Sequence, residues 1–391
     1  MSSAVKTTGS ALKYNDSHRH ATWLELFFDL VFVAAISVVT HSLGHLHHGH
    51  IEAKQLVAFG VAFVPIWWIW ASHTLYANRF DSDSKSQRVG TLFIMFLMAA
   101  MASSLGDNVV SSYGRLILFY VIIRVLIAGT YWLSASRVTT ELGRFARAMS
   151  HAGFAGAAIS GVALLFDGSL RSTIFLAGIL FEMIAAVVIS RRASVTSVHR
   201  SHLVERVGLL SIILLGESVI SLVGGLKDVT WDPLNITAAT AGFLMVGAIW
   251  WIYFDSFDIL ERTKRLEHGF VLLYSNVLFC MGLAMLANLI LHAILDEIAM
   301  ADFRILAIAG LTLFYLGKQI TYYYVLPIYR PNILINSTVC LAITVASTFL
   351  SRPEYALVGM TFGLFFYVYS NIRWTLTKDA TEYLIPEAEA A

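Results

Sequence analysis

Acidic and basic residues lie inside long apolar segments of this 391-residue chain. Burying such a residue in lipid costs about 2.5–3.5 kcal/mol on insertion scales, so each is expected to face a protein interior with a partner or water. Because these carboxylates outnumber the permanent cations, the set favours bound protons or cations over a purely structural network of ion pairs. The residues are Glu25, Asp29, Arg124, Glu182, Glu205, Arg206, Glu217, Asp255 and Lys318.

Three of the carboxylates form the predicted proton or cation pathway. Glu25 and Asp29 are four residues apart and therefore share one helix face. Two ionised carboxylates this close repel each other, so either a cation sits between them or one is protonated. Glu217 follows Gly216, whose missing side chain leaves room for a partner or ligand. We expect Asp29 and Glu217 to be the leading sites, with Glu25 assisting.

The remaining ionisable residues are predicted to pair or to line the pathway. Arg124 and Glu182 lie at similar depth, which predicts a buried pair with a structural or gating role. Asp255 and Lys318 lie toward the cytoplasmic side of their segments, at depths that suit a hydrated vestibule. Glu205 and Arg206 either join the buried charges or, as an alternative, reach from a helix end into water.

Histidines gather after the first apolar segment, but they do not predict a metal centre. His41 and His45 are four residues apart, a spacing that allows two histidines on one helix face to bind a divalent cation. No cysteine or carboxylate pattern completes such a site, and solvated loop histidines are the alternative. The two cysteines lie within apolar stretches, so we expect no disulfide framework, no zinc site and no cofactor. The residues are His41, His45, His47, His48 and His50, with Cys280 and Cys340.

Twelve apolar segments must position these side chains. Each is close to the roughly 20 residues that cross a bilayer core as a helix. The chain is 57% hydrophobic and 14% charged, with a mean hydropathy of +0.70, which excludes an ordinary soluble domain. The sequence predicts an all-α polytopic membrane protein with spans at 22–44, 54–76, 88–105, 113–135, 144–166, 170–190, 203–224, 235–257, 267–290, 302–325, 333–350 and 355–372.

The distribution of basic residues predicts the orientation. Of the 27 lysines and arginines, 18 fall at the two termini or after even-numbered spans, and only six follow odd-numbered spans. This bias places both termini in the cytoplasm. Residues 1–20 lack the apolar core of a removable signal peptide, so the first span is expected to act as a signal anchor. The net charge of +1 provides no basic field for nucleic acid.

A short internal similarity predicts two halves. The run from Pro65 to Trp70 resembles the run from Ala248 to Tyr253, which lies 183 residues later. We predict six-helix membrane repeats at 17–196 and 197–378, related by an axis along the membrane normal. Polar tails at 1–16 and 379–391 flank them, and the second is acidic and expected to be disordered. Chance similarity between tryptophan-rich helices is the alternative explanation.

Two longer motifs carry a family resemblance. The run WLELFFDLVFVAAI at 23–36 and the segment from HLVERVGLL at 202–210 to LGES at 215–218 resemble the bacterial low-temperature-requirement A (LtrA) family. The resemblance covers about residues 17–378 and implies a bacterial inner-membrane protein associated by name with growth in the cold. The two-halved lysosomal-type potassium channels are a weaker analogy. The arginine of their opening motif is missing before Phe27-Phe28-Asp29, and the seventh span lacks Phe-x-Asp.

The missing motifs narrow the function. The chain has no Walker lysine loop, no His-Glu-x-x-His, no Gly-x-Ser-x-Gly and no potassium-filter sequence. We therefore expect a secondary transporter, not an enzyme, coupled to protons or a cation and with its pathway between the two halves. Its expected partners are the lipid bilayer and a small solute or cation, without nucleic acid. The alternatives are a cation channel and a membrane-embedded accessory protein or enzyme that acts on lipid or envelope precursors.

Overall fold

The fold is a bundle of long helices. The computed structural model describes residues 20–44, 49–82, 84–105, 112–138, 140–193, 198–227, 229–263, 265–266 and 269–384. The α-helices are α1 Trp23–His41, α2 Ala53–Phe80, α3 Lys85–Leu105, α4 Tyr113–Ala135, α5 Thr140–Val162, α6 Gly168–Arg192, α7 Arg200–Lys227, α8 Pro233–Phe254, α9 Phe257–Arg262, α10 Phe270–Leu295, α11 Met300–Val325, α12 Arg330–Ser347 and α13 Pro353–Ser370.

Local signals in the sequence start the helices. Before α1, the Thr22 hydroxyl accepts a bond from the Glu25 backbone N–H at 3.3 Å, and the Glu25 carboxylate accepts one from the Thr22 N–H at 2.8 Å. This reciprocal capping box satisfies two backbone donors that a helix start leaves unpaired. Before α8, the Asp232 carboxylate accepts two backbone N–H groups, and Pro233 fills the first helical position.

The membrane prediction is confirmed at the level of architecture. In the part of the chain that the structure describes, twelve helical segments are long and apolar enough to cross a bilayer. Large apolar side chains stay exposed along them, including Phe96, Ile220, Phe243 and Phe362, as expected for surfaces that face lipid. Within the described ranges there is no strand, and an isolated bridge pairs Thr263 with Leu384.

Several boundaries differ from the predicted ones. Helix α2 continues to Phe80, because its last turns pack against the start of α7 rather than entering water. Helix α9 is a separate short segment after α8. In the predicted tail, Thr381–Tyr383 forms a 3₁₀ turn and Leu384 pairs with Thr263, so this part is ordered. Residues 385–391 lie outside the described part of the chain.

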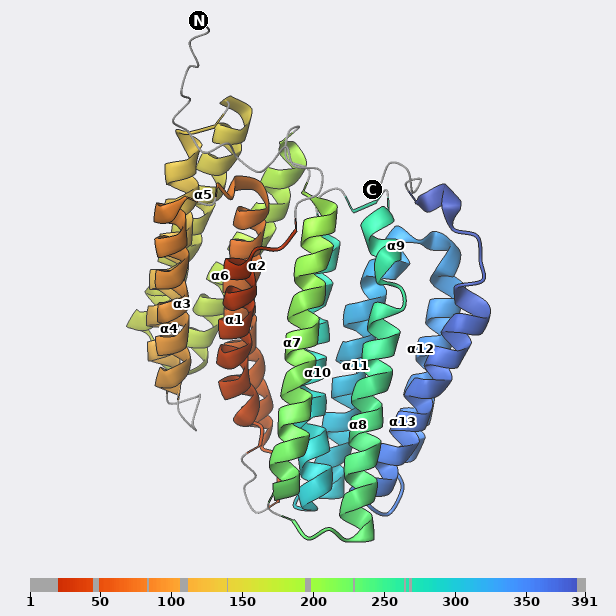
Figure 1. Ribbon diagram of the computed structural model, residues 1–391. Coiled ribbons are helices and arrows are strands. Elements are labelled where there is room, and N and C mark those ends of the chain that lie inside the picture. The colour runs from red at the N-terminus through yellow and green to blue at the C-terminus, as the bar shows by residue number, and fades with distance from the viewer. Residues whose placement is uncertain are drawn as a thin grey trace, which may run out of the picture.

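The first six helices meet the later helices along α1, α2, α7 and α10. Figure 1 shows α1–α6 on the left of the view and α7–α13 on the right. Helices α1 and α2 contact both α7 and α10, and the rings of Trp67 and Trp68 lie edge-on to Tyr274 at 6.0 Å. The start of α1 and the end of α13 lie at the same end of the bundle (Figure 1). The seam between α1 and α7 is where the buried charges concentrate.

Candidate functional site

Two carboxylates and one guanidinium meet between α1 and α7. Arg206 is completely buried, donates to Asp29 Oδ1 from Nη2 at 2.5 Å, and places Nη1 3.3 Å from Glu25 Oε1. It therefore points into the protein and does not reach into water from the helix end. We call this group, with the polar side chains that contact it, the α1–α7 cluster: Glu25, Asp29, Trp70, Asn78, His202 and Arg206.

Within the α1–α7 cluster, Glu25 has a full set of donors. Its carboxylate accepts from the Thr22 backbone N–H at 2.8 Å, from the Thr22 hydroxyl at 3.0 Å and from His202 Nε2 at 3.1 Å, besides its ion pair with Arg206. A carboxylate that accepts several bonds in a buried site is stabilised in its charged form. Glu25 is thus the carboxylate built to stay ionised.

Asp29 has fewer partners, although it is fully buried. Its Oδ1 accepts from the Trp70 indole N–H at 2.7 Å and from Arg206. Its Oδ2 has no hydrogen-bond partner among the described residues. A buried carboxylate oxygen without a donor is costly when charged, so Oδ2 is the position in the α1–α7 cluster where a proton or a small cation is best accommodated.

His202 is held in a neutral tautomer by Asn78. The Asn78 Oδ1 accepts from the His199 backbone N–H at 3.0 Å, which fixes the amide orientation. Its Nδ2 then donates to His202 Nδ1 at 3.0 Å and to the His199 carbonyl at 3.1 Å. An Nδ1 that accepts a bond carries no proton, so His202 Nε2–H is the group that donates to Glu25.

The charges of the α1–α7 cluster therefore do not cancel. Among the described residues, Glu25 and Asp29 would carry two negative charges against the single positive charge of Arg206, with His202 neutral. An uncompensated charge in a buried site is expensive, so this group of residues is suited to take up one proton or one cation. This arrangement can bind and release a proton without breaking the Arg206–Glu25 pair.

A second buried cluster lies between α2, α4 and α6. Arg124 forms an ion pair with Glu182 and donates to the Ser72 hydroxyl, so the two residues that we expected to pair are in contact. The Trp68 indole N–H donates to the same Glu182 oxygen at 3.1 Å. Gly156 lies directly against Glu182, because a Cβ there would sit 2.0 Å from its Cγ. One cation here meets one carboxylate, and we call this group the α2–α4–α6 cluster.

Glu217 lies on the same α1–α7 seam as Arg206, but farther along it. It is eleven residues after Arg206, a separation of about 16 Å along a helix. Its carboxylate accepts a bond from the Ser37 hydroxyl, and Nε2 of the half-exposed His41 lies 3.8 Å from Glu217 Oε1. A Cβ at Gly216 would meet nothing within 4 Å, so the space beside this position is open.

The structure separates the other predicted pathway residues from these clusters. Lys318 is buried, and its Nζ lies 5.0 Å from the Tyr322 ring centre and 5.6 Å from that of Tyr367. No ion pair to Lys318 is present among the described residues. Asp255 caps the C-terminus of α8 and is exposed. Glu205 is partly exposed and accepts the Ala21 backbone N–H at 3.0 Å.

The predicted histidine group is only partly described. His50 Nδ1 lies 2.7 Å from Asp302 Oδ2, and His41 lies near Glu217, so each of these faces a carboxylate on a different helix. His45, His47 and His48 lie outside the described residues. His73 of α2 is buried and stacks on Phe28 with ring centres 4.1 Å apart.

Sequence reasoning did not identify three polar contacts of the α1–α7 cluster. Trp70 belongs to the tryptophan-rich run that we interpreted only as a repeat, and Asn78 lies just beyond it. His202 opens the second family motif, but nothing in its spacing pointed to Glu25. The signal in the sequence was the presence of these polar residues in or beside the two motifs. Their partners could not be predicted, because the partners depend on which helices are neighbours.

Comparison with known proteins decides the family. The family description "Bacterial low temperature requirement A protein (LtrA)" matches residues 20–368. The chain belongs to the LtrA family. The match includes every residue of both clusters, together with Glu217 and Lys318. This LtrA-family chain is also similar to the uncharacterized protein RA0937 of Rhizobium meliloti (strain 1021), with 25% identity over 344 residues that cover 78% of each chain.

Proposed function

We propose that this LtrA-family protein is a proton-coupled secondary transporter whose proton site is Asp29. The observation that carries the proposal is the unequal charge of the α1–α7 cluster, in which two buried carboxylates share one guanidinium. Buried ionisable residues in membrane proteins commonly mark ion pathways and proton relays. Glu25 keeps Arg206 paired while the proton on Asp29 comes and goes.

The position of the α1–α7 cluster supports coupling to a movement. Asp29 lies on α1 and Arg206 on α7, so a shift of α1 against α7 would change the distance between them. Loss of the Arg206 contact would favour protonation of Asp29, and its return would favour release. This is the link between proton binding and conformation that a secondary transporter needs.

The apolar stretch between the α1–α7 cluster and Glu217 favours a transporter over an open channel. The buried face of α1 carries Phe32 and Ile36 there, and that of α7 carries Leu210 and Leu214. All four are at most 1% exposed. The two polar sites would thus be reached from opposite sides, with Glu217 and Ser37 forming the second one.

The proposed setting is the bacterial inner membrane with both termini in the cytoplasm, as the basic-residue bias predicts. The two groups of helices on either side of the α1–α7 seam would be the moving parts. The cargo is a small solute that travels with, or in exchange for, protons. The family description ties such a protein to a requirement at low temperature, and transport of a solute needed for growth in the cold would account for that association.

The decisive experiment measures proton movement in proteoliposomes that contain a pH-sensitive dye. An imposed pH gradient should drive flux with wild-type protein, and Asp29→Asn should abolish it. Glu217→Gln should abolish it as well, since the second site would no longer exchange a proton. Glu297→Gln is the matched control, because Glu297 is an exposed carboxylate far along the chain from both sites, and it should keep wild-type flux.

Two outcomes would contradict the proposal. Full flux in both Asp29→Asn and Glu217→Gln would remove these residues from the pathway. Flux that never saturates with gradient or solute, and that persists in Asp29→Asn, would instead fit a channel. Each variant must first show the same monodisperse elution in detergent as wild type, so that loss of flux is not loss of fold.

A further inference from the structure

A large pocket opens at the end of the bundle where α6 and α11 end and α10 and α12 begin. Its volume is about 920 Å³. Residues spaced four apart line it from three helices, and such residues share one helix face: Val187 and Arg191 of α6, Phe270, Tyr274 and Leu278 of α10, and Ile320 and Tyr324 of α11. The pocket is separate from both charge clusters, and no residue of either cluster lines it.

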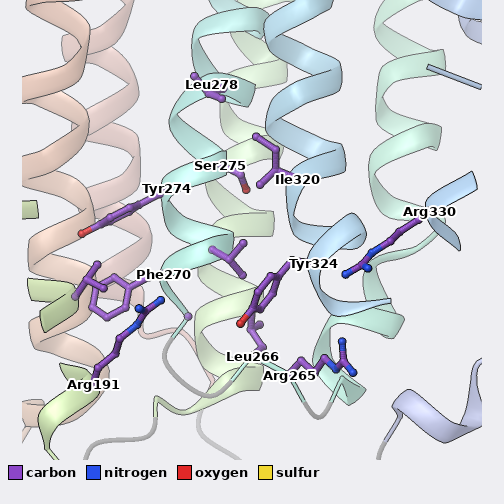
Figure 2. Close-up of a pocket in the computed structure, with 13 residues that line it drawn as sticks. Arg191, Arg265, Leu266, Phe270, Tyr274, Ser275, Leu278, Ile320, Tyr324 and Arg330 are labelled. Atoms are coloured by element: carbon purple, nitrogen blue, oxygen red, sulfur yellow. The ribbon is translucent and has the colours of Figure 1, made fainter. Parts of the chain in front are cut away.

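Three arginines gather at the mouth of this pocket. Arg191 lies in the last turn of α6, Arg265 lies between α9 and α10, and Arg330 starts α12. Figure 2 shows Arg191 and Arg330 extending from opposite sides toward the middle of the pocket, with Tyr324 between them and Arg265 below. No acidic residue is among the described residues that line the pocket, so these residues bring positive charge to its mouth.

The three arginines have few competing partners. Arg330 Nε donates to the Tyr323 carbonyl at 2.8 Å, and Arg265 lies over the Tyr383 ring at 5.5 Å. Among the described residues no ion pair engages any of the three. A guanidinium presents several N–H donors in a fixed plane that matches the oxygens of phosphate. The mouth of the pocket is therefore suited to a phosphate group.

Apart from the Ser275 hydroxyl, which bonds to the Thr321 hydroxyl at 2.7 Å, the inner part of the pocket is apolar. Leu278 lies eight residues into α10 from Phe270, a depth of about 12 Å along the helix. Ile320 and Val187 complete this wall, and Figure 2 shows Leu278 and Ile320 in the upper part of the view, away from the arginines. Charged groups at the helix ends and apolar walls at hydrocarbon depth match a molecule with an anionic head and an apolar tail.

We propose that this pocket binds an anionic membrane phospholipid, with its phosphate between Arg191, Arg265 and Arg330 and an acyl chain against Leu278 and Ile320. Basic pockets between membrane helices on the cytoplasmic side are suited to anionic headgroups, and each nearby arginine contributes about 1 kcal/mol, or about five-fold in affinity. The site also joins α6 to α10, which already touch through the Tyr274 hydroxyl and the Met183 carbonyl at 2.7 Å. Bound lipid would therefore stabilise the contact between these helices.

Native mass spectrometry of the delipidated full-length protein in neutral detergent tests the proposal. Phosphatidylglycerol should bind at least ten-fold more tightly than phosphatidylcholine of the same chain length. Arg191→Gln and Arg265→Gln should each weaken phosphatidylglycerol about five-fold, and the double variant about 25-fold. Arg330 is left unchanged because its bond to the Tyr323 carbonyl also supports the start of α12.

The matched control removes the same charge outside the pocket. Arg192 and Arg373 are exposed arginines that do not line the pocket, and Arg192→Gln with Arg373→Gln should stay within two-fold of wild type. Equal weakening in the control would show that general surface charge, not the pocket, holds the lipid. Equal binding of phosphatidylglycerol and phosphatidylcholine would also overturn the proposal.

A further arm separates lipid from a soluble anion. Glycerol phosphate and inorganic phosphate share the headgroup chemistry but lack the acyl chain that would contact Leu278 and Ile320. They should displace phosphatidylglycerol only at concentrations at least 100-fold higher. Displacement at matching concentrations would overturn the lipid assignment and make the pocket a site for a soluble phosphate compound. Proton flux plays no part in this test, so its result does not depend on the proposed transport function.

Discussion

The α1–α7 cluster and the α2–α4–α6 cluster are built from the same parts. In each, an arginine bonds to a buried carboxylate oxygen that also accepts a tryptophan indole N–H, from Trp70 to Asp29 and from Trp68 to Glu182. Trp68 and Trp70 are two residues apart on α2, about 200° around the helix. Helix α2 therefore stands between the clusters and contributes one tryptophan to each.

The clusters differ in charge balance. The α2–α4–α6 cluster has one cation and one carboxylate, whereas the α1–α7 cluster adds Glu25 as a second carboxylate for the single Arg206. The α2–α4–α6 cluster also lies within the first six helices, while the α1–α7 cluster joins one of these helices, α1, to α7, the first helix after them. A balanced pair holds helices together, whereas the unequal charges of the described residues in the α1–α7 cluster suit the uptake of a proton or a cation under the proposed function. Replacing a carboxylate by an amide at each site can expose this difference.

The largest expected effect comes from Glu182→Gln. The amide can still accept from Trp68, but Arg124 then becomes a buried cation without a counterion, so the free energy of unfolding should fall by about 3–5 kcal/mol. Unfolding in mixed SDS micelles, followed by tryptophan fluorescence, measures this change. The double variant Arg124→Met with Glu182→Met should recover most of the loss, because it leaves no unpaired charge. A wild-type stability for Glu182→Gln would mean that the pair is not ionised.

Gly156→Ala should have the next largest effect. Its Cβ would lie 2.0 Å from Glu182 Cγ and must push the carboxylate away from Arg124, at a cost of about 1–3 kcal/mol in the free energy of unfolding. Gly161→Ala in the same helix is the control, because its nearest neighbour would be Val121 Cγ2 at 3.8 Å. The same micellar unfolding measurement applies, and equal stability of the two variants would show that the Glu182 position is adaptable.

Asp29→Asn should change stability by less than about 1 kcal/mol, in contrast with Glu182→Gln. The amide oxygen keeps the bonds from Trp70 and Arg206, and Arg206 keeps Glu25 as its counterion. A stability loss as large as that of Glu182→Gln would show that Asp29 is permanently ionised and that the clusters are equivalent. Proton flux in proteoliposomes, measured on the same preparation, should nevertheless be lost.

Gly216→Ala should have the smallest effect and the opposite sign. A Cβ there meets nothing within 4 Å, and alanine is favoured over glycine inside a helix by about 0.5–1 kcal/mol. We expect a slight gain in stability and unchanged proton flux, although Gly216 precedes Glu217. A loss of flux in the stable variant would support the hypothesis that this glycine makes room for a ligand.

The sequence indicated the depth of each charged residue in the membrane, and this depth was enough to predict part of the site. Arg124 and Glu182 lie at similar depth in segments that follow each other closely, and the structure places them in contact. Arg206 lies near a helix end, and depth alone allowed it to reach water. Its actual partners on α1 could be known only from the packing of α1 against α7.

The sequence by itself determined the all-helical polytopic architecture and the family. Backbone groups in lipid must bond within their own segment, so each span can be recognised from its local sequence. It also located several of the buried charges, since an apolar run around a charge indicates its depth, although Asp255 is exposed and Glu205 partly exposed. Only the tertiary structure decided the neighbours: Asn78 beside His202, Trp70 beside Asp29, and the three arginines around one pocket. The physical reason is that contacts between helices depend on how each span is rotated and on which spans are neighbours in space. Hydropathy carries little information about either.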